Sequence, residues 1–267
     1  MGKPGRIVPD GDEEFWFAEH CFERLKKFTS LPYELILVDN GSVGGKELLR
    51  DNADVLVTNK ENLGFAKGCN QGFKLATGDW ICCMNNDIFV WEGWLEALIE
   101  VFDKKENCGV SMPALFREER DARKVLEIDK IDLSKNHDKF GEGAEFGSCW
   151  LTKKSILDKV GLFDENFKVG FGEDRDLWRR MRRDGYETYR THNTRVFHQG
   201  NVTMSKITER TTFTFPNRAY LKQIRELEVN GKILNDEEKK NIKEEIEKDY
   251  KKNWDSNREY LKEKWGY

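Results

Sequence analysis

The amino-acid sequence predicts an α/β fold organised around a doubly wound, mostly parallel sheet. Short apolar runs, typical of strands that are buried on both faces, alternate with segments whose apolar residues recur at helical spacing. This alternation is typical of a parallel sheet covered by helices on both sides. The 267 residues suffice for one large domain of this kind and an appendage.

The composition argues against several classes of protein. Charged residues make up 35% and aromatic residues 12% of the chain, which favours a folded globular protein over a disordered or membrane-spanning one. A formal net charge of −4 gives no support for a nucleic-acid partner. No apolar run approaches the roughly 20 residues of a membrane span, and the N-terminal residues lack the apolar core of a signal peptide. We expect a cytoplasmic protein, and a peripheral position at a membrane surface stays open.

The first half of the chain carries the clearest alternation. A truncated strand at residues 7–9 precedes a helix at residues 13–28, in which apolar residues follow helical spacing. The apolar run YELILV suits a buried strand, whereas Phe65, Cys69 and Phe73 mark one face of a helix. Strands are expected at residues 33–38, 54–58, 80–84 and 108–112, and helices between them at 46–50, 64–76 and 95–102.

The second half is more irregular. A polar and charged excursion over residues 118–139 includes a possible strand at 125–128. From residue 216 the chain is helical and highly charged, and Asn235 with Glu238 forms a plausible helix cap. The remaining elements are a strand at 145–152, a helix at 153–160, a loop at 163–172, a helix at 173–183 and short strands at 186–190 and 194–198.

Acidic residues follow two of the predicted strands. Asp39 comes directly after the strand at residues 33–38, and Asp87, the last residue of Asn85-Asn86-Asp87, follows the strand at 80–84. Open α/β sheets bind ligands at this edge. One carboxylate is a typical protein contribution to a Mg²⁺ or Mn²⁺ ion held mainly by phosphates and water. Both residues also suit a plain role in turns, Asp39 as a cap of the next helix.

Two further groups could carry chemistry. Glu173 and Asp174 stand together at the start of a predicted helix. Crowded carboxylates raise one another's pKa, which suits a general base, although acids also favour the first helical turn because of the helix dipole. His198 ends the last predicted strand. A neutral imidazole is a common ligand of Mn²⁺-like ions, but a lone histidine is more often structural.

The order of these groups resembles the family 2 glycosyltransferases with the GT-A fold, rhamnosyltransferase-like members most of all. The motifs VDNGS, NLGFAKGCN, NND and GED and a strand-end histidine follow one another over about residues 33–200. The resemblance implies a GT-A fold with a C-terminal helical extension. It also implies an inverting, metal-dependent hexosyltransferase of polysaccharide biosynthesis. The donor would be a UDP- or dTDP-sugar, and the acceptor a hydroxyl of a glycan, a glycolipid or another molecule.

The same resemblance implies a domain plan. Residues 1–215 would form the GT-A domain, with a nucleotide-binding half at about 1–112 and an acceptor-binding half at about 113–215. Residues 216–267 would form the charged helical extension. A homodimer contact or a membrane-surface contact through this extension stays open.

The resemblance also assigns roles to single residues. Asp87, in the place of the DxD motif, and His198 would bind Mn²⁺ or Mg²⁺. Asp174 would be the catalytic base, Glu173 would hold the acceptor, and Trp150 would line the acceptor or donor-sugar site. The nucleotide would be bound by Pro9, Asp39, Asn40, Asn62, Gly64, Asn70, Asn85 and Asn86.

Two departures from the family pattern bear on this reading. The first strand is reduced to residues 7–9, and the DxD motif is reduced to one acid, Asp87. A non-catalytic nucleotide-sugar or glycan-binding module on the same fold is the main alternative, against which the intact Glu173-Asp174 pair argues. A nucleotidyltransferase is a second alternative, but the chain shows no basic glycine-rich loop near its N-terminus.

Overall fold

The computed structural model describes residues 13–42, 44–119, 121–135, 147–168, 172–198 and 235–266. The chain divides into two compact units. The first consists of Met1–Glu165 and Glu173–Gln199, and the second of Asn166–Gly172 and Gly200–Tyr267. The short segment Asn166–Gly172 therefore belongs with the C-terminal part of the chain, although both of its ends are joined covalently to the first unit.

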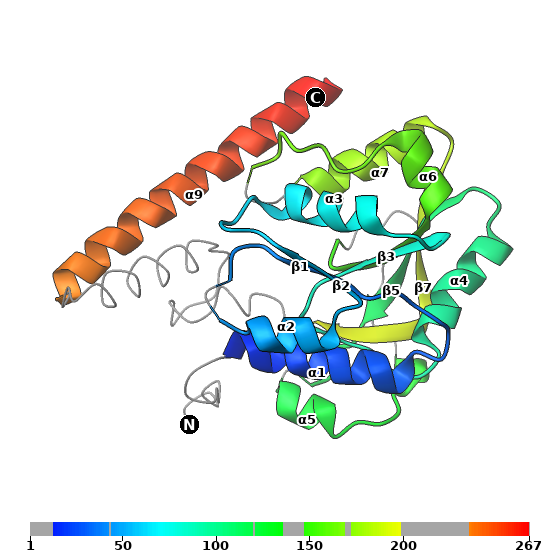
Figure 1. Ribbon diagram of the computed structural model, residues 1–267. Helices are drawn as coiled ribbons and strands as arrows, with labels where there is room; N and C mark the ends of the chain where they lie inside the picture. Colours follow the sequence, from blue (N-terminus) through cyan, green and yellow to red (C-terminus); the bar gives the residue numbers. More distant parts are fainter. Residues whose placement is uncertain are drawn as a thin grey trace. The chain divides into compact units, whose positions relative to one another are not determined.

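The first unit is built on two sets of paired strands (Figure 1). The strands β1 (Ile36–Asp39) and β2 (Val55–Thr58) pair in parallel. The second set is a five-stranded sheet in the order β3-β6-β5-β7-β4. The bounds of its strands are Trp80–Met84 for β3, Ile88–Phe89 for β4, Cys108–Leu115 for β5, Cys149–Lys153 for β6 and Glu187–His198 for β7.

The directions of the strands decide which of their ends meet. The strands β3 and β5 are both antiparallel to β6, and β7 is parallel to β5, so β3, β5 and β7 run the same way. The strands β6 and β4 run against them. One edge of the sheet therefore gathers the carboxyl ends of β3 and β7 with the amino ends of β6 and β4.

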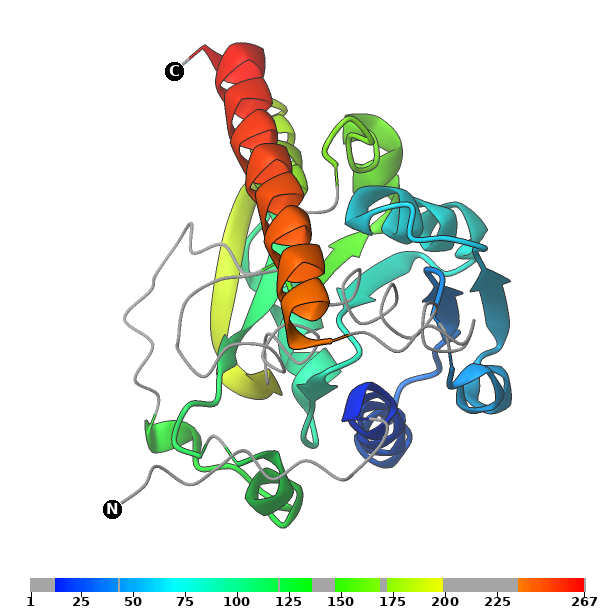
Figure 2. The ribbon, with the colours of Figure 1, turned by 90° about the vertical axis from the view of Figure 1, so that its left-hand side faces the viewer.

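Helices cover both faces of the five-stranded sheet (Figures 1 and 2), which confirms the predicted doubly wound α/β fold. The helices α3, α6 and α7 pack on one face, and α1 and α4 pack on the other. Trp150 of β6 lies in the first layer, and its neighbours Cys149 and Leu151 lie in the second, because successive side chains of a strand point to opposite faces. The bounds are Glu13–Phe28 for α1, Lys46–Asn52 for α2, Phe65–Leu75 for α3, Trp94–Lys104 for α4, Lys154–Val160 for α6 and Glu173–Arg183 for α7.

Two elements differ from the expectation. Residues 125–128, expected as a possible strand, include the end of the helix α5 (Ala122–Leu126). The Asp121 carboxylate caps this helix by accepting a hydrogen bond from the Arg123 amide at 3.1 Å. The two short strands expected after residue 185 are one strand, β7, which passes an irregularity in register between Thr191 and Arg195. The predicted strand at residues 7–9 lies outside the described residues.

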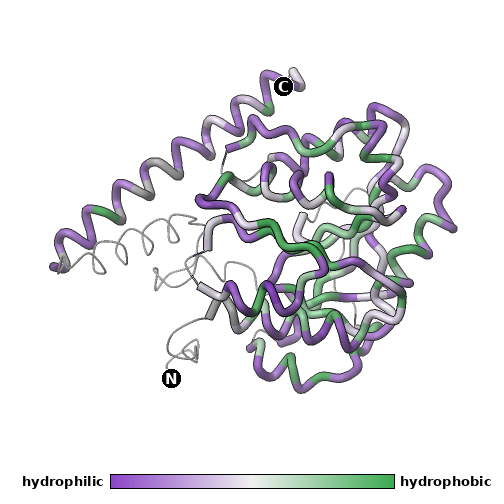
Figure 3. The backbone as a smooth tube through the Cα atoms, in the orientation of Figure 1, coloured by the Kyte–Doolittle hydropathy of each residue, from purple (hydrophilic) through white to green (hydrophobic). Residues whose placement is uncertain are grey.

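The second unit contains the long helix α9 (Asp236–Trp265). The capping prediction is confirmed, because the Asn235 side chain accepts from the Glu238 amide and the Glu238 side chain accepts from the Asn235 amide. Figure 3 shows that α9 is mainly hydrophilic, whereas the strands of the first unit are mainly hydrophobic. None of the described helices is both long enough and apolar enough to cross a membrane. The remaining described helical segment is a short 3₁₀ turn at Leu133–Lys135.

Candidate active site

Asp39 lies at the carboxyl end of β1 and is 3% exposed. Its carboxylate accepts a hydrogen bond from the Ser42 amide at 2.8 Å, and its backbone carbonyl accepts one from the Asn59 amide at 2.8 Å. The first contact is that of an aspartate in a turn. The helix α2 begins after Gly45, so Asp39 is not the cap of that helix.

Asn40 ties the loop after β1 to the loop after β2. Its amide group donates to the Asn62 side chain at 2.9 Å and to the Gly64 carbonyl at 3.0 Å, and its carbonyl oxygen accepts from the Leu63 amide at 3.0 Å. Gly41 has φ +83°, and a Cβ there would lie 2.7 Å from the backbone of Glu61, so only glycine lets the two loops approach this closely. Four of the residues predicted to bind a nucleotide, Asp39, Asn40, Asn62 and Gly64, are thus brought together.

Asn70, also predicted to bind a nucleotide, falls outside this group. Asn70 is 3% exposed, and its side-chain amide forms two hydrogen bonds with the backbone of Phe163. It donates to the Phe163 carbonyl at 2.9 Å and accepts from the Phe163 N–H at 3.0 Å. It therefore holds the residues that follow α6. Pro9 lies outside the described residues.

Asp87 and His198 meet at the edge where β7 ends. The antiparallel pairing of β4 with β7 places Ile88 opposite His198, and Asp87 precedes Ile88 directly. The Asp87 Oδ1 atom lies 3.3 Å from His198 Nε2, and the two side chains are 10% and 19% exposed. A carboxylate oxygen and an imidazole nitrogen suit Mn²⁺, and the carboxylate also suits Mg²⁺. Within the described residues no group of three or more possible metal ligands occurs, so this pair would need further ligands from a substrate or from water.

Asn85 and Asn86 connect β3 to this pair. The Asn85 amide donates to the Ser148 carbonyl at 2.8 Å, which continues the pairing of Met84 with Cys149. Asn86 is exposed. The loop after β3 is therefore fixed against the residues that precede β6.

Asp174 reaches the same edge from the first turn of α7. A Cβ on Gly147 would lie 2.6 Å from Asp174 Oδ2, so the Asp174 carboxylate packs directly on the Gly147 backbone. Its Oδ1 atom accepts a hydrogen bond from the Arg175 amide at 2.7 Å. Because Gly147 precedes Ser148, two successive residues connect Asp174 to the loop that carries Asp87. This contact between Asp174 and Gly147 was not predicted from the sequence. Its signal in the sequence is the small dipeptide Gly147-Ser148, which directly precedes an apolar strand.

Glu173 is buried next to Asp174. The residue is 5% exposed, and its Oε2 atom has no hydrogen-bond partner among the described residues. Burial first, and then the negative charge of Asp174, raise the pKa of Glu173 to about 8. At neutral pH the side chain of Glu173 is therefore mostly protonated.

The shifted pKa of Glu173 predicts a dependence of stability on pH. The folded protein holds the Glu173 proton more tightly than the unfolded chain, whose ordinary pKa is 4.5. The contribution of this group to stability is therefore complete below pH 4.5 and is lost as pH rises to about 8. Glu173→Gln does not titrate, so it should lessen the fall of stability across this range. Urea unfolding at a series of pH values measures this, with the exposed Glu92→Gln as control; equal slopes for the two variants would contradict it.

Trp150, which the resemblance places at the acceptor or donor-sugar site, lies in the core of the first unit. Its side chain is fully buried and packs edge-to-face on Trp178, with ring centroids 5.2 Å apart. Phe73 and Phe163 complete the aromatic cluster around it. The physical reason is the pleat of β6, which directs this side chain into the layer under α3, α6 and α7.

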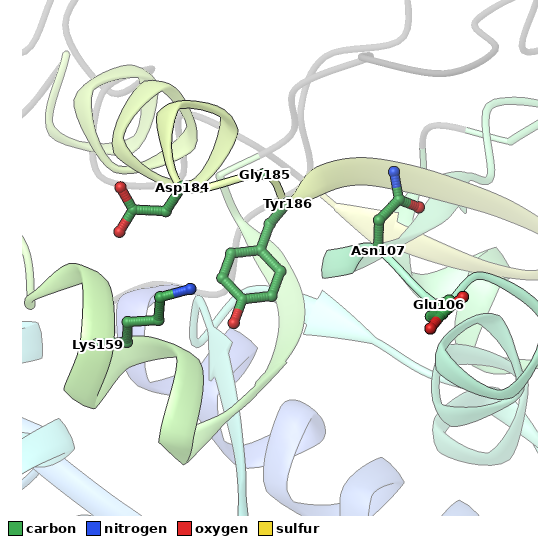
Figure 4. A pocket seen from close by; sticks show the side chains of 6 residues that line it. All are labelled: Glu106, Asn107, Lys159, Asp184, Gly185 and Tyr186. Atoms are coloured by element: carbon green, nitrogen blue, oxygen red, sulfur yellow. The ribbon is translucent and has the colours of Figure 1, made fainter.

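A hollow lies at the other end of the sheet (Figure 4). Glu106 and Asn107 precede β5, and Gly185 and Tyr186 precede β7. The ammonium group of Lys159 lies over the Tyr186 ring, 4.8 Å from its centroid. Residues of the hollow precede β7, whereas His198 is the last residue of β7, so the two lie at opposite ends of this strand. This hollow is therefore separate from the edge that carries Asp87, His198 and Asp174.

Solved structures share this fold. One similar structure is GalNAc-T7 with UDP, GalNAc and Mn²⁺, with a TM-score of 0.50 and 16% sequence identity, and the match covers 66% of this chain and 39% of that one. Another is the mannosyltransferase PcManGT from Pyrobaculum calidifontis with GDP-Man and Mn²⁺, with a TM-score of 0.52 and 19% identity, and the match covers 79% of this chain and 61% of that one. A third is residues 1–349 of TarS from S. aureus, with a TM-score of 0.52 and 14% identity, and the match covers 86% of this chain and 66% of that one. These likenesses show a fold of the GT-A type. The chain spans less than two thirds of the length of each of these structures.

The sequence of the chain places it in a family. The model of Glycosyl transferase family 2 matches residues 15–161, which is more than half of the chain, so the protein belongs to this family. Among curated proteins no sequence matches it. The predicted fold and family are thereby confirmed, while the roles of single residues stay predictions.

Proposed function

We propose that the protein is an inverting glycosyltransferase that moves a sugar from a nucleotide-diphosphate donor to an acceptor hydroxyl with the help of a divalent metal. The observation that carries the proposal is the convergence of two acidic groups at one sheet edge. Asp87 lies 3.3 Å from His198, and the Asp174 carboxylate packs on Gly147, next to the residue that accepts from Asn85. In this proposal residues 1–215 form the transferase domain and residues 216–267 the helical extension.

The donor nucleotide would lie over the loops after β1, β2 and β3. Asp39 and Asn40 would meet the base, with Asn62 and Gly64 shaping the pocket and Asn85 or Asn86 facing the ribose or the sugar. The network around Asn40 supports this assignment, because it holds the two loops in one geometry before any ligand binds. GalNAc-T7 and PcManGT were solved with UDP and with GDP-Man, which supports a nucleoside diphosphate without deciding its base.

Asp87 and His198 would hold a Mn²⁺ or Mg²⁺ ion against the donor diphosphate. Such an ion supplies positive charge that stabilises a departing phosphate. The presence of Mn²⁺ in the GalNAc-T7 and PcManGT structures supports a divalent metal here. The two protein ligands are few, so affinity for the metal without nucleotide should be low.

Asp174 would remove the proton of the acceptor hydroxyl as its oxygen attacks the anomeric carbon from the side opposite the leaving diphosphate, which inverts the configuration. Glu173, protonated at neutral pH, can donate a hydrogen bond to the acceptor. The acceptor would be a hydroxyl of a glycan, a glycolipid or another molecule.

A thermal-shift screen tests the function as a whole. UDP, dTDP, GDP and their sugar conjugates are added with and without Mn²⁺, and ligands that bind only the folded state raise the melting temperature. We expect a shift with at least one nucleoside diphosphate that is larger with Mn²⁺. The absence of any shift would overturn the proposal. Nucleotide binding without hydrolysis of any donor would instead favour the non-catalytic binding module.

Asp87→Ala should remove the metal dependence of donor binding. The variant lacks the carboxylate that would hold the ion, so calorimetry with the best nucleoside diphosphate should give the same affinity with and without Mn²⁺. The exposed Asp51→Ala serves as control and should keep the metal dependence of the wild type. A metal dependence in Asp87→Ala equal to that of the wild type would show that Asp87 is not a ligand.

A further inference from the structure

The long helix α9 makes its closest packing over one short stretch. Among the side chains of α9 that the structure describes, Asn257 and Leu261 are the buried ones, at 4% and 5% exposed. Trp254, one turn before Asn257, is 38% exposed. The packing of this helix is therefore concentrated near its C-terminal end, within the second unit.

Asn257 binds the backbone of a single residue with both ends of its amide. Its Oδ1 atom accepts from the Lys168 N–H at 3.0 Å, and its Nδ2 atom donates to the Lys168 carbonyl at 2.7 Å. A buried side chain that satisfies both polar groups of one residue fixes the position of that residue. The segment preceding the acidic pair is thus held by a helix that lies 89 residues further along the chain.

Phe167 contacts both α9 and Gly172, the residue that precedes Glu173 and Asp174. Its ring is 2% exposed and packs edge-to-face on the Tyr260 ring, with centroids 5.2 Å apart. It also contacts Gly172, where a Cβ would lie 2.9 Å from Phe167 Cε1. Gly172 has φ +97°, a conformation that favours glycine, so the backbone is shaped to rest on this ring.

Gly172 is bonded directly to Glu173, the first residue of α7. A series of contacts therefore leads from Asn257 and Tyr260, through Lys168 and Phe167, to the residue that precedes the two acids. Leu261 alone could anchor the helix by apolar burial. The two hydrogen bonds of Asn257 also fix the position of the Lys168 backbone relative to α9, because hydrogen bonds are directional and apolar burial is not.

We propose that Asn257 is a positioning residue: α9 holds residues 166–168 and, through Phe167 and Gly172, sets where the carboxyl groups of Glu173 and Asp174 stand toward the acceptor. This inference rests on the proposed function for its catalytic consequence, but its structural part does not. It assigns to the C-terminal helix a part in the reaction that its charged sequence does not suggest.

The first test needs no activity. Hydrogen exchange is measured for peptides covering residues 172–180 in the wild type, in Asn257→Ala and in the matched control Asn253→Ala. Asn253 lies one turn earlier on the same helix and is half-buried. We expect exchange in these peptides to rise roughly tenfold in Asn257→Ala and to stay at the wild-type rate in the control. Equal exchange in all three proteins would overturn the proposal.

The second test uses hydrolysis of the donor that gives the largest thermal shift. We expect Asn257→Ala to lower kcat by about tenfold, because small misplacements of a catalytic group are costly. The donor KM and the nucleotide affinity should stay within about twofold of the wild type, since the nucleotide loops lie elsewhere in the chain. An unchanged kcat, or an equal loss in Asn253→Ala, would overturn the proposal. A wild type that binds nucleotide and hydrolyses no donor would instead count against the proposed function, while the exchange result still decides whether α9 holds the segment.

Discussion

Asp174→Asn is expected to slow glycosyl transfer and donor hydrolysis by about 10²–10⁴-fold, because the amide cannot take a proton from the attacking hydroxyl. Asparagine has nearly the same shape as aspartate, so the packing on Gly147 is kept. The affinity for a nucleoside diphosphate with Mn²⁺ should stay close to that of the wild type, since the proposed metal ligands are unchanged. Steady-state rates and calorimetry on the same preparation separate the two effects.

Asp184→Asn is the matched control for this experiment. Asp184 follows the other end of α7, where it pairs with Arg183 at 3.3 Å and lines the hollow at the far end of the sheet. We expect this variant to keep the wild-type rate. Full activity in Asp174→Asn would show that another group is the base, and a loss of nucleotide affinity equal to the loss of rate would point to a binding role.

Asp176→Ala is expected to lower the free energy of unfolding by about 3–5 kcal/mol, because it leaves the charge of Arg180 buried without its counter-ion. Asp176 is fully buried, and its Oδ2 atom lies 2.8 Å from Arg180 Nε. The same guanidinium donates to the carbonyls of Val160, Gly161 and Leu162 at 2.7–2.9 Å. The pair thereby ties α7 to the end of α6, and urea unfolding measures the loss.

An exposed ion pair provides the comparison. Arg183→Ala breaks the contact with Asp184 at a side chain that is 63% exposed, and it should cost between 0 and about 1 kcal/mol. The double variant Asp176→Leu with Arg180→Met should recover part of the stability, because it removes both charges. A loss in Asp176→Ala no larger than that in Arg183→Ala would contradict the assignment.

The elements with strong local signals could be predicted from the sequence. The bounds of β3 and α7 agree with the prediction, because each begins and ends at a clear change of pattern. Residues 125–128 could not be assigned this way, since a short apolar run fits a strand or a helix equally. Contacts with a residue far away in the sequence also help to hold this segment, because Arg24 donates hydrogen bonds to the carbonyls of Leu126 and Ile128.

The candidate site was predictable as a set of residues and not as a geometry. The motif order selected Asp87, His198 and Asp174, but the pairing that brings Asp87 to His198 runs through β4, a strand of two residues with no pattern of its own. The burial of Trp150 could not be predicted either, because alternation along a strand does not tell which face is covered by helices. Asn257 carried no signal at all, since its partner is a backbone 89 residues away.

The hydrogen bonds between Asn257 and Lys168 can form only late in the synthesis of the chain. The two residues are 89 positions apart, so at translation rates of about 5–20 residues per second the helix emerges roughly 5–20 s after the segment it holds. A ribosome-bound chain that has already made β1 to β7 would still lack the hydrogen bonds by which Asn257 holds Lys168. On the proposed function and the proposed role of Asn257, the enzyme would reach its full turnover only after α9 has been made, so a chain that stops before Asn257 would be a slow transferase.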